Sequence, residues 1–134
     1  MAQDPVEVVL KEIDKEMDNF IDRVFELSQR TLIDEGKIDT GTMLKTANVN
    51  RKFLEKEIVY PALYSDVIEY GRNPGTMPPP MALNKWVRRK LNVSNETEIR
   101  NISFAIATAI KNRGIEPLQF LRNSIDKARG EFNL

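Results

Sequence analysis

The chain has 134 residues, of which 41% are hydrophobic and 30% are charged, a balance typical of one globular domain rather than of a disordered chain. Its 20 basic and 20 acidic side chains cancel, so the net charge does not indicate a nucleic-acid or membrane partner. The absence of cysteine and histidine excludes disulfides, thiolate chemistry and the commonest metal ligand, which favours a non-enzymatic protein.

The first 36 residues predict one long helix. Asp4 and Pro5 suit a helix start, and Gly36 suits its end. Between them lies an apolar seam with steps of four and three residues, as in a coiled coil: Val6, Leu10, Ile13, Met17, Phe20, Val24 and Leu27. A helix over 6–35 is roughly 45 Å long and overhangs a chain about 36 Å across, which leaves part of the seam for another chain. The alternative is a bend near Ser28, with two shorter helices that pack within the chain.

Residues 37–71 are predicted to be mainly β. Two antiparallel strands, near 43–49 and 53–59, fit the alternation of apolar residues, and Pro61 ends the second strand. Residues 62–70 fit either a short helical turn or a third strand.

A loop rich in proline and glycine follows at residues 72–80, and its three consecutive prolines favour a stiff, extended segment. The loop is either a rigid surface crossover or a projecting contact arm. Residues 81–130 are predicted to be helical, and the broad apolar stripe of 95–113 suggests the central core helix. Together, residues 1–134 predict a single α+β domain in which helices pack on a small antiparallel sheet after a long N-terminal helix.

Charge is distributed unevenly along the chain. Residues 1–36 carry 10 acidic and 4 basic side chains, whereas residues 72–130 carry 4 acidic and 11 basic ones. The acidic and basic parts either fold against each other within one chain or meet between neighbouring copies. Head-to-tail contacts of the second kind close into rings when the rotation between copies permits.

Candidate catalytic and metal sites are weak. The triplet Asp39-Thr40-Gly41 is that of aspartic proteases, but it follows charged residues instead of an apolar strand, and a largely helical chain does not build their all-β barrel. The carboxylates of the first helix fit a solvated face better than a metal site. No glycine-rich phosphate loop, signal peptide or membrane-spanning apolar stretch occurs in the sequence. We therefore expect no enzymatic activity, no metal, no cofactor and no membrane association.

The helix predicted at 81–91 contains a basic cluster beside Trp86: Lys85, Arg88, Arg89 and Lys90. With the next helix it could form a helix-turn-helix, as in a small nucleic-acid-binding regulator. The face of that next helix that would read bases is mostly apolar. A basic protein–protein surface is therefore the favoured interpretation, and the regulator is the alternative.

Three motifs, in this order, carry a resemblance to a known family. Ile-Asp-Thr-Gly at 38–41 resembles the family's Val-Asp-Thr-Gly, and residues 64–71, Tyr-Ser-Asp-Val-Ile-Glu-Tyr-Gly, resemble its Tyr-Ala-x-Tyr-Val-Glu-Phe-Gly. Phe-Leu-Arg-Asn-Ser-Ile at 120–125 resembles its Pro-Phe-Leu-Arg-Pro-Ala-Leu. The chain thus resembles the tail-completion, or head–tail joining (neck), proteins of long-tailed bacteriophages and proviruses.

The resemblance implies a structural virion protein without catalytic residues. It would form a ring, a hexamer or dodecamer, between connector and tail-tube or tail-terminator proteins, and DNA would pass through without specific binding. It implies a location at the neck of the virion, and in the host cytoplasm during assembly. The candidate contacts with neighbouring subunits or partners are Asp39, Gly41, Glu69, Tyr70, Gly71, Pro74, Met77, Pro78, Pro79, Pro80, Lys85, Arg88, Arg89 and Arg122.

Overall fold

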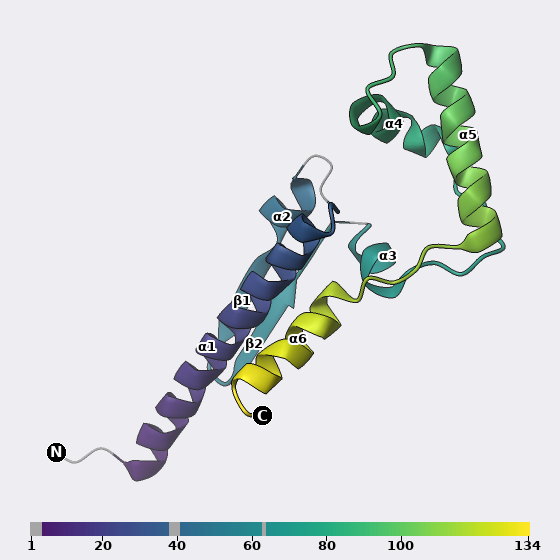
Figure 1. Cartoon of the computed structure of the whole chain (residues 1–134). Coiled ribbons are helices and arrows are strands. Elements are labelled where there is room, and N and C mark those ends of the chain that lie inside the picture. The colour runs from purple at the N-terminus through teal and green to yellow at the C-terminus, as the bar shows by residue number, and fades with distance from the viewer. Residues whose placement is uncertain (1–3, 38–40, 63) are drawn as a thin grey trace. The chain divides into compact units, whose positions relative to one another are not determined.

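The computed structural model describes residues 4–37, 41–62 and 64–134 and confirms the predicted α+β class, with a long N-terminal helix and a small antiparallel sheet (Figure 1). Its elements are α1 (Pro5–Asp34), α2 (Thr42–Thr46), β1 (Asn48–Lys52), β2 (Glu55–Val59), α3 (Ser65–Tyr70), the 3₁₀ helix η1 (Pro80–Leu83), α4 (Asn84–Lys90), α5 (Glu96–Arg113) and α6 (Phe120–Glu131). The contacts within the chain divide it into two compact units. The first unit comprises Met1–Ser65 and Gln119–Leu134, and the second comprises Asp66–Leu118.

Helix α1 begins where the sequence predicts. The Asp4 side chain accepts a hydrogen bond of 2.9 Å from the backbone N–H of Val6, and Pro5 occupies the first turn. The helix then runs to Asp34 as one element of 30 residues. The alternative of two shorter helices separated near Ser28 is therefore wrong.

The predicted β region is mixed rather than mainly β. Residues expected to begin the first strand form the short helix α2, which buries Met43. Strand β1 begins only at Asn48 and pairs antiparallel with β2, from Asn48 opposite Val59 to Lys52 opposite Glu55. Strand β1 is almost entirely polar and exposed. The alternation of apolar residues that predicted a strand from residue 43 therefore does not mark where β1 begins.

The core of the first unit lies between the C-terminal half of α1, strand β2 and α6. Val24 and Leu27 are buried against Ala128, with Phe20 and Ile58 packed at the edge. The aromatic rings extend this core: Phe20 meets Phe132 edge-on at 5.5 Å between ring centres, and Tyr60 meets Phe120 edge-on at 5.0 Å.

The second unit packs η1 and α4 on α5. Val87 of α4 is fully buried, as are Ile99 and Ala107 of α5. The expectation that α5 is a central core helix is wrong, because η1 and α4 cover only one side of it and Phe104 remains exposed. Helix α5 begins next to Asn95, whose side chain caps the helix by accepting a bond of 2.9 Å from the backbone N–H of Glu98.

The two ends of the second unit cross at a pair of glycines. Arg72 and Ile115 exchange two backbone hydrogen bonds, each of 2.8 Å. A Cβ atom at Gly71 would lie 2.4 Å from the carbonyl oxygen of Ile115, and one at Gly114 would lie 2.2 Å from that of Arg72. Only residues without a side chain allow this approach, so both glycines are structural.

Candidate functional site

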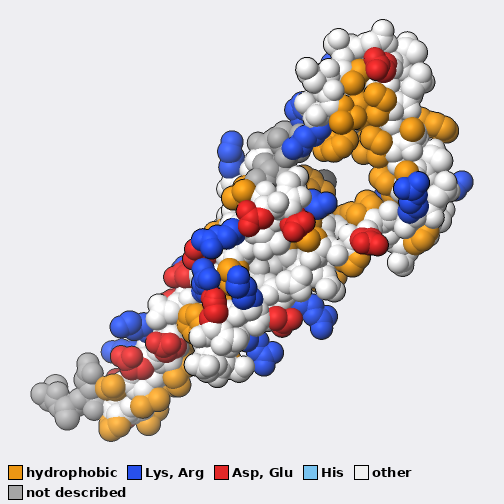
Figure 2. Space-filling model, in the orientation of Figure 1, with side chains coloured by type: hydrophobic (Ala, Val, Ile, Leu, Met, Phe, Trp, Pro, Cys, Tyr) orange, Lys and Arg blue, Asp and Glu red, His pale blue; other side chains and the backbone are white. Residues whose placement is uncertain are grey.

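The apolar seam of α1 is buried in its C-terminal half and uncovered in its N-terminal half. Val24 and Leu27 lie in the core, whereas Val6 is 62% exposed and Ile13 is 46% exposed. Figure 2 shows apolar side chains gathered at the N-terminal end of α1. This end of the helix extends past the hairpin and α6, so none of the other described elements of the first unit covers it (Figure 1).

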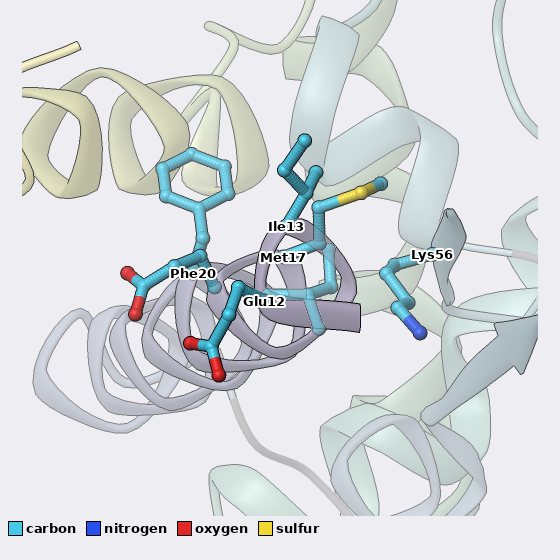
Figure 3. Close-up of a pocket in the computed structure, with 7 residues that line it drawn as sticks. Glu12, Ile13, Met17, Phe20 and Lys56 are labelled. Carbon is cyan, nitrogen blue, oxygen red and sulfur yellow. The ribbon is translucent and has the colours of Figure 1, made fainter. Parts of the chain in front are cut away.

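The exposed part of the seam continues into an apolar groove of about 480 Å³ on the first unit. Ile13, Met17 and Phe20 extend from one side of α1, and Lys56 comes from β2 (Figure 3). The groove is lined by Glu12, Ile13, Glu16, Met17, Phe20, Ile21 and Lys56.

Ion pairs fix the inner edge of this groove. The Lys56 ammonium lies 2.8 Å from an Asp14 carboxylate oxygen and 3.2 Å from one of Asp18, and its side chain is only 5% exposed. Asp14 also accepts a bond of 2.8 Å from the backbone N–H of Leu54, which ties the hairpin turn to α1. Arg51 adds bonds to Asp18 and Asp22. The charges on this side of α1 therefore attach the hairpin to the helix.

The same contacts shift the acidity of these groups. The hydrogen bond from Lys56 holds the pKa of Asp14 below its ordinary value, and the bond from Arg51 does so for Asp18. The bond to Asp14 raises the pKa of Lys56. All three groups are therefore charged at neutral pH. At the outer rim, Glu12 and Glu16 make no ion pair with any residue that the structure describes.

In the second unit, η1 and α4 combine cations with exposed apolar side chains. Four of the seven residues of α4 are Lys or Arg. Lys85, Arg88 and Arg89 are exposed, and Arg88 pairs with Glu96 at the start of α5. Met81 is 80% exposed and Trp86 is 37% exposed, whereas Val87 is fully buried.

The proline- and glycine-rich loop is anchored over its first half. The backbone N–H of Gly75 donates to the carbonyl of Lys111 at 2.7 Å, and the Arg72 guanidinium donates to the carbonyl of Thr76 at 3.3 Å. These bonds fit the rigid crossover rather than a projecting arm. Pro74 and Pro79 are exposed, Met77 and Pro78 are half-buried, and Pro80 begins η1.

The remaining candidate contacts are scattered. Asp39 lies outside the described residues, so the structure does not place the aspartic-protease triplet. Gly41, with φ of 81°, precedes α2, and Arg122 is exposed on α6, both in the first unit. Glu69 is buried in the second unit, whereas its neighbour Tyr70 is exposed. The predicted contact residues that the structure describes are therefore divided between the two units.

The groove contains residues that the list of predicted contacts omits. Ile13 and Met17 belong to the seam, which is the signal that marks them in the sequence. Lys56 has no such signal, because its burial depends on α1 and the hairpin meeting. Among the described residues, no group of three or more acidic side chains is placed to hold a metal ion, and no helix is long and apolar enough to cross a membrane.

Comparison with known proteins finds no match, either among protein-family models or among curated proteins and solved structures.

Proposed function

We propose that the protein is a non-enzymatic structural protein that assembles with its own copies into a ring at the head–tail junction of a long-tailed phage particle. The uncovered half of the apolar seam is the observation that carries this proposal. Helix α1 presents Val6 and Ile13 of the seam to solvent. Val9 flanks the seam on the same side of the helix, three positions from Val6 and four from Ile13, and is also exposed. An apolar stripe of this kind is stabilised when a partner removes it from water.

Charge supports contacts between copies. The α1 rim carries Glu12 and Glu16, whereas α4 is strongly basic. The two surfaces lie on different units, so a contact between them is head-to-tail and repeats from one copy to the next. Such repetition produces a ring when the rotation closes.

The motif resemblance supplies the location in the particle. The ring would be a hexamer or dodecamer in the virion neck, between connector and tail-tube or tail-terminator proteins, after assembly in the host cytoplasm. DNA would pass through its bore without specific binding.

The test combines oligomeric state with particle assembly. Light scattering and electron microscopy of the purified chain should detect rings, and the chain should restore infectivity when mixed with separated heads and tails. Val9→Asp should reduce both activities without changing the circular-dichroism spectrum. Asn19→Asp, a matched acidic change at another exposed position of α1, should leave both intact. A chain that stays monomeric and fails to join heads to tails contradicts the proposal.

The alternative function is a small nucleic-acid-binding regulator, and the exposed cations of α4 favour it. A titration with duplex DNA distinguishes the two functions, because non-specific attraction to phosphate falls steeply with salt. Sequence-dependent affinity that persists near physiological salt supports the regulator. Weak binding that disappears over the same range supports the structural protein.

A further inference from the structure

We propose that the groove on α1 of one copy binds the η1–α4 segment of a second copy. This inference rests on the proposed function and names the surfaces through which the ring would form. The groove offers an apolar floor, at Ile13 and Met17, beside an acidic rim, at Glu12 and Glu16. Its occupant must therefore be an apolar segment that carries positive charge.

A second copy of α1 does not meet this requirement. Pairing two α1 seams would place the residues that flank the seam against each other, and on the uncovered half these include Glu7, Asp14 and Glu16. The hairpin cations already bind Asp14, but Glu7 and Glu16 leave the flanks of both uncovered seams acidic. Like charges at these flanking positions oppose pairing.

The η1–α4 segment is apolar and positively charged, as the groove requires. Its exposed surface carries the apolar side chains of Met81 and Trp86 and the cations of Lys85 and Arg89. Met81, Lys85 and Arg89 follow one another at intervals of four positions, the spacing of neighbours on one side of a helix. The opposite side of α4 is fixed on α5 by buried Val87, so the exposed side is presented on a supported helix. Methionine and tryptophan are well suited to apolar contact surfaces. In the docked arrangement, Met81 and Trp86 contact the floor and Lys85 faces Glu16.

Engineered cysteines test the contact directly, because the chain has no cysteine of its own. Ile13→Cys in one tagged copy and Met81→Cys in a differently tagged copy should give a mixed disulfide under mild oxidation. Lys15→Cys is the matched control, because position 15 lies on the other side of α1 from position 13 and is exposed. The control copy mixed with Met81→Cys should give at least tenfold less cross-linked product.

Charge exchange provides a second readout. Lys85→Glu should raise the concentration at which the protein half-assembles by up to about fivefold, the range for an exposed ion pair. Adding Glu16→Lys to the same chain should restore assembly, because the pair is re-formed with its charges exchanged. Lys45→Glu, an equal charge change on α2, should have no effect.

The outcomes separate this inference from the proposed function. Rings that form without the cross-link between positions 13 and 81 overturn the docking model and leave the ring-forming function standing. A double variant, Ile13→Cys with Met81→Cys, that cross-links only within one chain also overturns it, because the groove is then filled by the chain's own α4. Absence of both rings and cross-links at every concentration overturns both proposals.

Discussion

A single methyl group at Gly114 should destabilise the crossing that holds the proline- and glycine-rich loop. Gly114 has φ of 72° and ψ of −164°, a backbone conformation that essentially only glycine adopts, at a cost of about 1–3 kcal/mol for other residues. The new Cβ would also lie 2.2 Å from the carbonyl oxygen of Arg72 and 3.0 Å from the backbone nitrogen of Pro74. Both neighbours are backbone atoms, so the crossing itself must shift, which adds about 1–3 kcal/mol. Gly114→Ala should therefore reduce stability by about 2–6 kcal/mol.

Gly36→Ala is the matched control. Gly36 has a similar φ of 67°, but no heavy atom lies within 4 Å of its added Cβ. Its cost is the conformational strain alone, about 1–2 kcal/mol. A larger loss in Gly114→Ala than in Gly36→Ala reports the close approach at the crossing together with the less accessible backbone conformation of Gly114.

Urea unfolding measures the two losses, and hydrogen exchange locates them. The amides of Arg72 and Ile115 donate the two bonds of the crossing, so their protection should fall in Gly114→Ala and remain in Gly36→Ala. Equal losses of stability in the two variants, with both amides still protected, would refute the assignment of Gly114 as a packing requirement.

Three further predictions concern the first unit. Phe120→Ala should cost about 3–5 kcal/mol in urea unfolding, because Phe120 is fully buried; a loss below 1 kcal/mol would contradict its core position. Tyr60→Phe should cost about 0.5–1.5 kcal/mol, since its hydroxyl bonds Ser28 at 2.6 Å, and an unchanged urea midpoint would show that this bond contributes nothing. The pKa values of Asp14 and Asp18 lie below their ordinary 3.8 in the folded protein. The stability that these two carboxylates contribute is therefore complete above about pH 5 and is lost as the pH falls through their folded-state pKa values. The urea midpoint should fall between pH 6 and pH 3, and an unchanged midpoint would exclude these ion pairs.

Local signals made the helices predictable. The caps at Asp4 and Asn95 use side-chain oxygens that accept bonds from nearby backbone N–H groups, so a few adjacent residues determine where α1 and α5 begin. Such bonds depend on short sequence separation and not on the rest of the fold. The long helix was therefore predicted within one or two residues of its observed ends.

The hairpin was harder to place because its stability comes from distant residues. Strand β1 has a polar sequence, and its position is fixed by Arg51 and by the turn amide of Leu54, which both bond to carboxylates of α1. Neither bond has a local sequence signature. The same reasoning applies to Lys56, whose burial in the groove requires α1 and β2 to be adjacent.

The apolar seam shows how the predictable and unpredictable parts combine. The spacing of its residues alone identifies a stripe that is too long for the rest of a small domain to cover. The position at which the stripe stops being buried depends on where α6 packs. The structure places that point near Phe20, which contacts Phe132 at the end of α6 and also lines the groove. Seam residues beyond it toward the C-terminus, such as Val24, stabilise the first unit, whereas Val6 contributes little to that core. The covered half of this stripe therefore holds the first unit together, whereas the uncovered half is the surface that we propose to contact a neighbouring copy.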